Sequence, residues 1–190
     1  MKVKKLLLIK HSLPEIDPGI PAAAWTLSEA GRQRCILLAQ RVAEYTPDMV
    51  ICSQEPKASE TGRLLARQLD LPWAVAPNLH EHERPTPGLA ARDVFESAVE
   101  SFFAHTEKLV FGAESAQQAR DRFEKAVEAV LNNYPAQTLA IVAHGTVISL
   151  FVAHKTGMDA FSLWKKLGLP SMVVLSLPDF KLEKVIGNVF

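Results

Sequence analysis

Short apolar runs alternate along the chain with segments in which apolar residues recur at every third or fourth position. A continuous apolar run is typical of a strand covered on both faces, and the wider spacing is typical of an amphipathic helix. The runs predict strands at 4–10, 49–53, 73–76, 138–143, 172–177 and 181–189, the last two as an antiparallel pair. The helical spacing predicts helices at about 27–42, 56–69, 93–105, 116–133 and 146–155.

Particular residues mark where these helices begin. Thr26 and Glu29 fit a capping box for the first helix, Pro56 suits the first turn of the second, and Ser115 is a candidate N-cap for the fourth. Strands separated by helices predict an α/β fold with a mainly parallel sheet. The length fits a single domain over 1–190, with a loop and helix insert at about 77–112.

Charge and cysteine content narrow the class of protein. Lys plus Arg and Asp plus Glu both number 21, so the formal net charge is zero. Binding to nucleic acid or to an acidic membrane depends on a cationic surplus, so we expect neither partner. Two cysteines, Cys35 and Cys52, are too few for a disulfide framework and are predicted to be buried and reduced. The apolar stretches are too short for a signal peptide or a membrane span, so we expect a soluble, cytoplasmic protein.

Polar side chains follow several of the predicted strands directly. Lys10 and His11 end the first strand, Lys57 lies in the first turn after the second, residues 80–84 follow the third, and His144 follows the strand at 138–143. Ligands of an open α/β sheet bind beyond the carboxyl ends of its strands. Helix N-termini there add N–H donors and a positive dipole end. The sequence therefore predicts an anion site, most naturally a phosphate site.

Each of these residues also has an ordinary structural interpretation. Lys10 and Lys57 could be solvated surface charges, and the polar stretch at 80–83 could be a solvated loop. His80 and His82 could instead face one metal ion, which would indicate a metal-dependent hydrolase. No acidic or cysteine-rich motif accompanies these two histidines, so the phosphate site is the favoured interpretation.

Six short motifs in one order indicate a known family. They are Leu-Leu-Ile-Lys-His-Ser at 7–12, Leu-Ser-Glu-Ala-Gly at 27–31, Ser-Gln-Glu-Pro-Lys-Ala-Ser-Glu-Thr at 53–61, Leu-His-Glu at 79–81, Gly-Ala-Glu-Ser at 112–115 and Ile-Val-Ala-His-Gly at 141–145. The ordered set resembles the histidine phosphatase superfamily, the phosphoglycerate mutase-like proteins, over nearly the whole chain. The resemblance implies a three-layer α/β sandwich with helices on both faces of a mainly parallel sheet.

The resemblance also implies an activity, a metal-independent phosphomonoesterase that uses no cofactor. His11 would be the nucleophile that forms a phosphohistidine, and Glu81 would be the general acid and then the base, with Glu83 as the fallback. His144 would stabilise the transferring phosphoryl group. The substrate-binding residues that the resemblance implies are Lys10, Ser12, Lys57 and Thr146, the last through its amide.

This sequence departs from the family motifs at the phosphate-binding positions. Both family arginines are lysines, Lys10 and Lys57, and Ser12 replaces a glycine. Arginine holds phosphate through a bidentate fork, whereas lysine is a mobile point charge. Reduced activity, or a phosphate-binding protein with little or no turnover, is therefore an alternative, unless Arg32 or Arg84 supplies the guanidinium. A phosphohistidine protein phosphatase is a second alternative.

The expected partner is a small phosphorylated substrate or inorganic phosphate. Specificity should come from the loop at 12–25, where Trp25 is a candidate lid, and from the insert at 77–112. Three aromatic residues of the predicted helix at 93–105 are interpreted mainly as core residues: Phe95, Phe102 and Phe103. The C-terminal strand could pair with a second copy at the sheet edge, as a homodimer.

Overall fold

A single twisted sheet forms the middle of the protein. The computed structural model describes residues 4–83, 92–135 and 138–189. Six strands lie in the order β3-β2-β4-β1-β5-β6. Their bounds are β1 Lys5–Lys10, β2 Met49–Cys52, β3 Trp73–Val75, β4 Thr138–Ala143, β5 Ser171–Ser176 and β6 Lys181–Ile186. The first four run parallel, and β5 and β6 form the predicted antiparallel pair at one edge.

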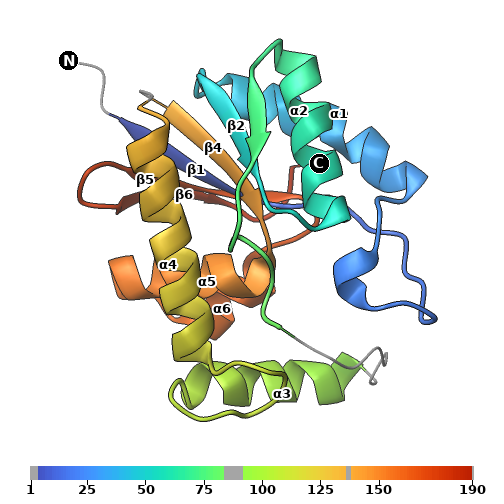
Figure 1. Ribbon diagram of the computed structural model, residues 1–190, viewed down its shortest axis with the longest axis vertical. Helices are drawn as coiled ribbons and strands as arrows, with labels where there is room; N and C mark the ends of the chain where they lie inside the picture. Colours follow the sequence, from blue (N-terminus) through green and yellow to red (C-terminus); the bar gives the residue numbers. More distant parts are fainter. Residues whose placement is uncertain (1–3, 84–91, 136–137, 190) are drawn as a thin grey trace.

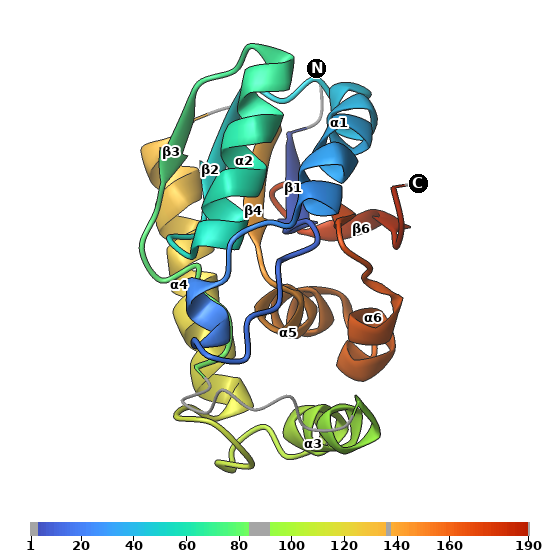
Figure 2. The same ribbon diagram turned by 90° about the vertical axis from the view of Figure 1, so that its right-hand side faces the viewer.

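Helices cover both faces of this sheet (Figures 1 and 2). α1 (Glu29–Ala43) and α2 (Pro56–Leu69) pack on one face, and α4 (Ala116–Asn133) and α5 (Gly145–Thr156) pack on the other. Each face has its own apolar core, because β1 and β4 are covered on both sides. Leu38 and Leu65 lie in the first core, and Phe123 and Phe151 lie in the second. The predicted three-layer α/β sandwich is confirmed.

Two further helices lie beyond the carboxyl ends of the parallel strands. α3 (Arg92–Ala104) was predicted within about one residue, whereas the short α6 (Ala160–Lys166) was not predicted. Figure 2 shows both below the sheet, and aromatic rings join them, with the Phe95 and Trp164 centroids 6.0 Å apart. A 3-10 turn, η1 (Ala22–Ala24), lies in the loop that follows β1. These segments surround the end of the sheet where ligands are expected.

The start of the first helix differs from the prediction. Ser28, and not Thr26, is the N-cap of α1, and its hydroxyl accepts a hydrogen bond from the Gly31 amide. The reason is that Leu27 is fully buried and forms a β-bridge with Pro14, which keeps the chain extended up to residue 28. The predictions for Pro56 in the first turn of α2 and for Ser115 as the N-cap of α4 are confirmed.

Both cysteines are buried and free, as predicted. Burial raises the pKa of the Cys35 thiol to about 11 and that of the Cys52 thiol to about 12. Across residues 4–83, 92–135 and 138–189, no helix combines the length and the hydropathy that crossing a bilayer requires. The single-domain boundaries, the insert and the homodimer stay predictions, and Arg84 lies outside the described residues.

Candidate active site

The pairing of β1 with β4 brings two histidines together. The strands are parallel neighbours with Lys10 opposite Ala143, so the residues that follow each strand emerge next to each other. The rings of His11 and His144 have centroids 5.2 Å apart. β2 flanks β4 on the other side and places Ser53 at the same edge, with its Oγ 2.9 Å from His144 Nε2. Three segments distant in sequence thus converge at one edge of the sheet.

The His11 ring is buried, neutral and fixed in one tautomer. Its Nδ1 lies 2.7 Å from the Ser12 carbonyl oxygen. Because a carbonyl only accepts, Nδ1 carries the hydrogen and Nε2 keeps its lone pair. Burial lowers the pKa of His11 well below the usual 6.5, and the positive charges of His144 and Lys57 lower it further. The imidazole therefore has an available nucleophilic nitrogen at neutral pH.

A cavity of about 540 Å³ opens over this edge of the sheet. Lys10, His11, Lys57 and Glu81 of the predicted set line it, and Ser12, His144 and Thr146 do not. His144 is fully buried behind His11. The apolar part of the lining comes from the first loop, α3, α6 and the segment after α6, and includes Leu13, Ile16, Trp25, Phe95, Trp164 and Leu169. The cavity thus has a polar floor and apolar walls.

Both lysines of the floor are engaged with protein acceptors. Lys10 Nζ donates to the Leu167 carbonyl at 2.7 Å, and its stem lies over Gly145, where a Cβ would approach Lys10 Cε to 3.0 Å. Lys57 is buried, and its Nζ donates to the Ala22 carbonyl at 2.7 Å and to the Glu55 carboxylate. Their ammonium groups are therefore already oriented at the cavity floor.

Glu55 is a buried carboxylate of this site that the sequence analysis missed. It forms an ion pair with Lys57, and its Oε1 accepts from the Glu81 amide at 2.7 Å. The same oxygen lies 3.7 Å from His144 Nε2. The available signal was an acidic residue two positions before the candidate phosphate-binding lysine, in the turn that precedes α2.

The Glu81 carboxylate lies at the N-terminus of α5. Its oxygens accept hydrogen bonds from the amides of Thr146 at 3.1 Å and Val147 at 3.3 Å, and from the His82 amide at 2.8 Å. The Thr146 amide thus donates to Glu81, which lines the cavity, and the substrate-binding role of Thr146 stays a prediction. Three N–H donors and a helix dipole favour the ionised carboxylate.

Arg122, a residue that sequence reasoning also missed, holds the segment that carries Glu81. Its guanidinium donates to the carbonyls of Asn78, His80 and Glu81 at 2.9, 3.0 and 3.2 Å. It also forms a two-point ion pair with the buried carboxylate of Glu114. Glu114 directly precedes the N-cap Ser115, and Arg122 lies on α4 eight positions later, so an acidic residue just before a helix that carries an arginine was the available signal.

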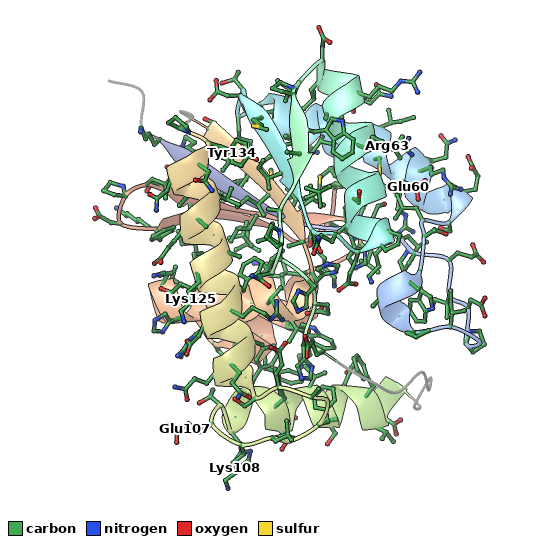
Figure 3. The ribbon with its side chains drawn as sticks, in the orientation of Figure 1. Glu60, Arg63, Glu107, Lys108, Lys125 and Tyr134 are labelled. Atoms are coloured by element: carbon green, nitrogen blue, oxygen red, sulfur yellow. The ribbon has the colours of Figure 1, made fainter. Side chains whose placement is uncertain are left out.

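Two other candidates point away from the cavity. The Ser12 hydroxyl donates to the Gly31 carbonyl at 2.7 Å, so it holds the first loop against α1 and does not face a ligand. The substrate-binding role of Ser12 stays a prediction. Arg32 pairs with Glu60 of α2 at 2.7 Å, so it supplies no guanidinium to the site. Figure 3 shows Glu60 on α2.

The histidines considered for a metal ion have separate partners. His82 is buried, with Nε2 3.1 Å from the Glu114 carbonyl oxygen and its ring beside Phe102. His80 pairs with Glu83 at 3.3 Å, and the Glu83 side chain is 54% exposed. In the part of the chain that the structure describes, no three histidine, cysteine or acidic side chains are arranged to hold a metal ion.

Comparisons with known proteins agree with this geometry. The chain is 27% identical over 168 residues to an adenosylcobalamin/alpha-ribazole phosphatase of Salmonella typhimurium, covering 84% of this chain and 83% of the relative. Its fold matches a solved mycobacterial hydrolase at a TM-score of 0.77, with 18% identity over 99% of this chain and 92% of that one. A mycobacterial glucosyl-3-phosphoglycerate phosphatase, solved with inorganic phosphate, matches at a TM-score of 0.73 with 21% identity over 98% of both chains.

The sequence profile of the histidine phosphatase superfamily (branch 1) matches residues 22–183. That range extends from η1 to β6 and includes Lys57, Glu81 and His144. The prediction of a phosphoric monoester hydrolase is confirmed at the level of the family and its phosphatase relatives. The chain belongs to branch 1 of the histidine phosphatase superfamily.

Proposed function

We propose that the chain is a metal-independent phosphomonoesterase that transfers a phosphoryl group from a small substrate to His11 and then to water. The observation that carries the proposal is the state of the His11 ring. Nδ1 donates to the Ser12 carbonyl, burial keeps the ring neutral, and the residue lines the cavity. A neutral imidazole with an available Nε2 attacks phosphorus without a metal ion.

The proposed reaction has two steps with balanced proton transfers. In the first, the Nε2 lone pair of His11 bonds to phosphorus, the ester P–O bond breaks, and Glu81 in its protonated form gives a proton to the leaving oxygen. In the second, ionised Glu81 takes a proton from water, the water oxygen bonds to phosphorus, and the bond to His11 breaks. His144, Lys10 and Lys57 are assigned to stabilise the transferring phosphoryl group.

Two observations favour a second candidate function, phosphate binding with little turnover. The hydrogen bonds to Glu81 favour its ionised form, which lowers the fraction that can act as an acid. Lys57 donates to Glu55 and to Ala22, so an arriving phosphate competes with groups already bound. Both effects reduce the rate without removing the nucleophile, so we expect slow hydrolysis.

The cavity walls support a small substrate with an apolar organic part. Trp25, Phe95 and Trp164 line the walls, and Trp25 Nε1 donates to the Asp17 carbonyl at 2.9 Å, which orients its ring. The volume of about 540 Å³ suits one small molecule. A phosphohistidine protein phosphatase stays a prediction that no observation here favours.

Hydrolysis of a chromogenic aryl phosphate in EDTA, from acid to neutral pH, tests the proposal. We expect turnover by the wild type and a loss of at least about 10³-fold in His11→Ala. His105→Ala is the matched control, because His105 is exposed on the chain after α3 and lies outside the cavity lining. Phosphate binding without turnover would replace hydrolysis by the second function. Loss of activity in EDTA, reproduced by His80→Ala, would indicate a metal-dependent hydrolase.

A further inference from the structure

Glu55 lies among the groups assigned to hold the phosphoryl group. Its carboxylate pairs with Lys57, accepts from the Glu81 amide at 2.7 Å and lies 3.7 Å from His144 Nε2. The residue is 9% exposed and lines the cavity. A buried negative charge at the floor of an anion site repels the anion and weakens its binding. That placement calls for an explanation in terms of the ligand.

The charges of the cavity lining give that explanation. Two lysines, Lys10 and Lys57, meet three carboxylates, those of Glu55, Glu81 and Glu83, of which Glu83 is half exposed. The remaining ionisable groups of the described lining are the histidines His11, His80 and His82, with His144 behind them. With His11 neutral, the described residues of the lining have no surplus of positive charge for a dianion.

A phosphoryl group that binds Lys57 competes there with acceptors of the protein itself. An ammonium group has three donors, and Lys57 directs one to Glu55 and one to the Ala22 carbonyl. A phosphoryl oxygen that binds Lys57 comes close to the Glu55 carboxylate. At about 5 Å and an effective dielectric constant of about 20, each additional unit of negative charge on the ligand weakens binding by about 10²-fold.

We propose that Glu55 sets the charge of the phosphoryl group that the cavity accepts, so that the site prefers a singly charged group over a doubly charged one. A phosphate monoester loses its second proton at about pH 6. The species that the cavity favours is therefore the monoanion, which dominates below that pH. The inference rests on the proposed function, because it concerns the phosphoryl group held in the same cavity.

The test is equilibrium binding of two probes, sulfate with two charges and methyl sulfate with one, measured by calorimetry near about pH 7.5, where both charges are fixed. The proteins are the wild type, Glu55→Gln and Glu55→Asp. Glutamine keeps an oxygen for the Glu81 amide and removes the charge, whereas aspartate keeps the charge. Circular dichroism and thermal unfolding establish that each variant is folded.

We expect the wild type to bind methyl sulfate at least as tightly as sulfate. Glu55→Gln should tighten the binding of both anions, and the gain for sulfate should exceed the gain for methyl sulfate by about 10²-fold, because sulfate carries one more unit of negative charge. Glu55→Asp keeps the negative charge, so it should bind the two anions in the same order of affinity as the wild type. A role that depends only on the size of the glutamate side chain predicts the same change in Glu55→Asp as in Glu55→Gln. A wild type that prefers sulfate by about 10-fold overturns the proposal even if neither variant folds.

The outcomes separate this inference from the proposed function. Turnover of the aryl phosphate with an unchanged sulfate affinity in Glu55→Gln overturns only the role of Glu55. Failure of every folded protein to bind either anion, together with absence of turnover, overturns the phosphoryl site itself and the inference with it.

Discussion

Arg122 joins α4 to the segment that carries Glu81, and its replacement makes the most informative perturbation. Its guanidinium has five donors, and it uses them on three carbonyls and both oxygens of Glu114. The side chains of Arg122 and Glu114 are 16% and 10% exposed, so the pair is largely shielded from water. Arg122→Ala leaves the Glu114 carboxylate buried and without this partner.

The magnitude follows from that burial. Breaking a buried ion pair by removing one partner lowers the free energy of unfolding by about 3–5 kcal/mol. Because both side chains are slightly exposed, we expect a loss of about 3 kcal/mol for this pair. For a chain of this length, a loss of about 3 kcal/mol lowers Tm by about 6–12 °C. Arg122→Lys keeps the charge but has three donors in place of five, so we expect about half of that loss.

The site should respond as well as the fold. Without Arg122, the carbonyls of His80 and Glu81 lose a donor, and the Glu81 carboxylate is held less firmly against α5. We therefore expect kcat on an aryl phosphate to fall by about 10-fold at temperatures well below Tm, because a displacement of about 1 Å is costly in catalysis. KM should change less, because Arg122 does not line the cavity.

Urea unfolding followed by circular dichroism, together with steady-state kinetics, measures both effects. Arg120→Ala is the control on the same helix, because Arg120 pairs with its neighbour Asp121 and should contribute no more than about 1 kcal/mol. A double-mutant cycle with Glu114→Ala should give a coupling energy of about 2 kcal/mol. The reasoning is refuted if Arg122→Ala loses no more stability than Arg120→Ala.

Three further predictions concern single groups. The pKa of His11 is lowered in the folded state, so below about pH 6.5 the unfolded state binds more protons than the folded state. The free energy of unfolding should therefore fall with decreasing pH by up to about 1.4 kcal/mol per pH unit. A folded His11→Gln variant with the same slope in urea titrations would contradict this prediction. Gly31→Ala places a Cβ 2.0 Å from the Leu13 carbonyl oxygen and should lower the free energy of unfolding by about 2 kcal/mol or more. Its control is Gln40→Ala on the exposed side of α1, which should change the free energy of unfolding by no more than about 0.5 kcal/mol. Cys35 and Cys52 should resist iodoacetamide near about pH 8 and react only after unfolding, and rapid labelling of the native protein would show that the thiols are accessible.

Elements with a strong local pattern could be predicted from the sequence. β1 and β4 are continuous apolar runs, and α4 combines helical spacing with the Ser115 capping box, so their bounds matched within a residue or two. The first cap was wrong because Thr26 and Ser28 both suit an N-cap locally, and only the pairing of Leu27 with Pro14 decides between them. α6 has seven residues, too short a window for a periodic signal.

The candidate site likewise contains residues that could be predicted from the sequence and residues that could not. His11 and His144 could be placed because residues after adjacent parallel strands must meet, a consequence of topology alone. The contacts of Ser12 and Thr146 with the Gly31 carbonyl and the Glu81 carboxylate could not be predicted, because these acceptors come from segments distant in sequence. Glu55 and Arg122 were missed for a related reason, because a charge acquires its role only from the groups that surround it.

The parallel pairing of β1 with β4 has a consequence for folding. β1 and β4 are neighbours in the sheet but are separated along the chain by β2, β3 and the helices α1 to α4, so His144 meets His11 only through a contact between distant parts of the sequence. Contacts between residues so far apart in sequence form slowly, because the loop that they close is long. The return of anion binding during refolding therefore reports the insertion of the central strand, and a chain with only its local helices formed would show helical circular dichroism without an anion site.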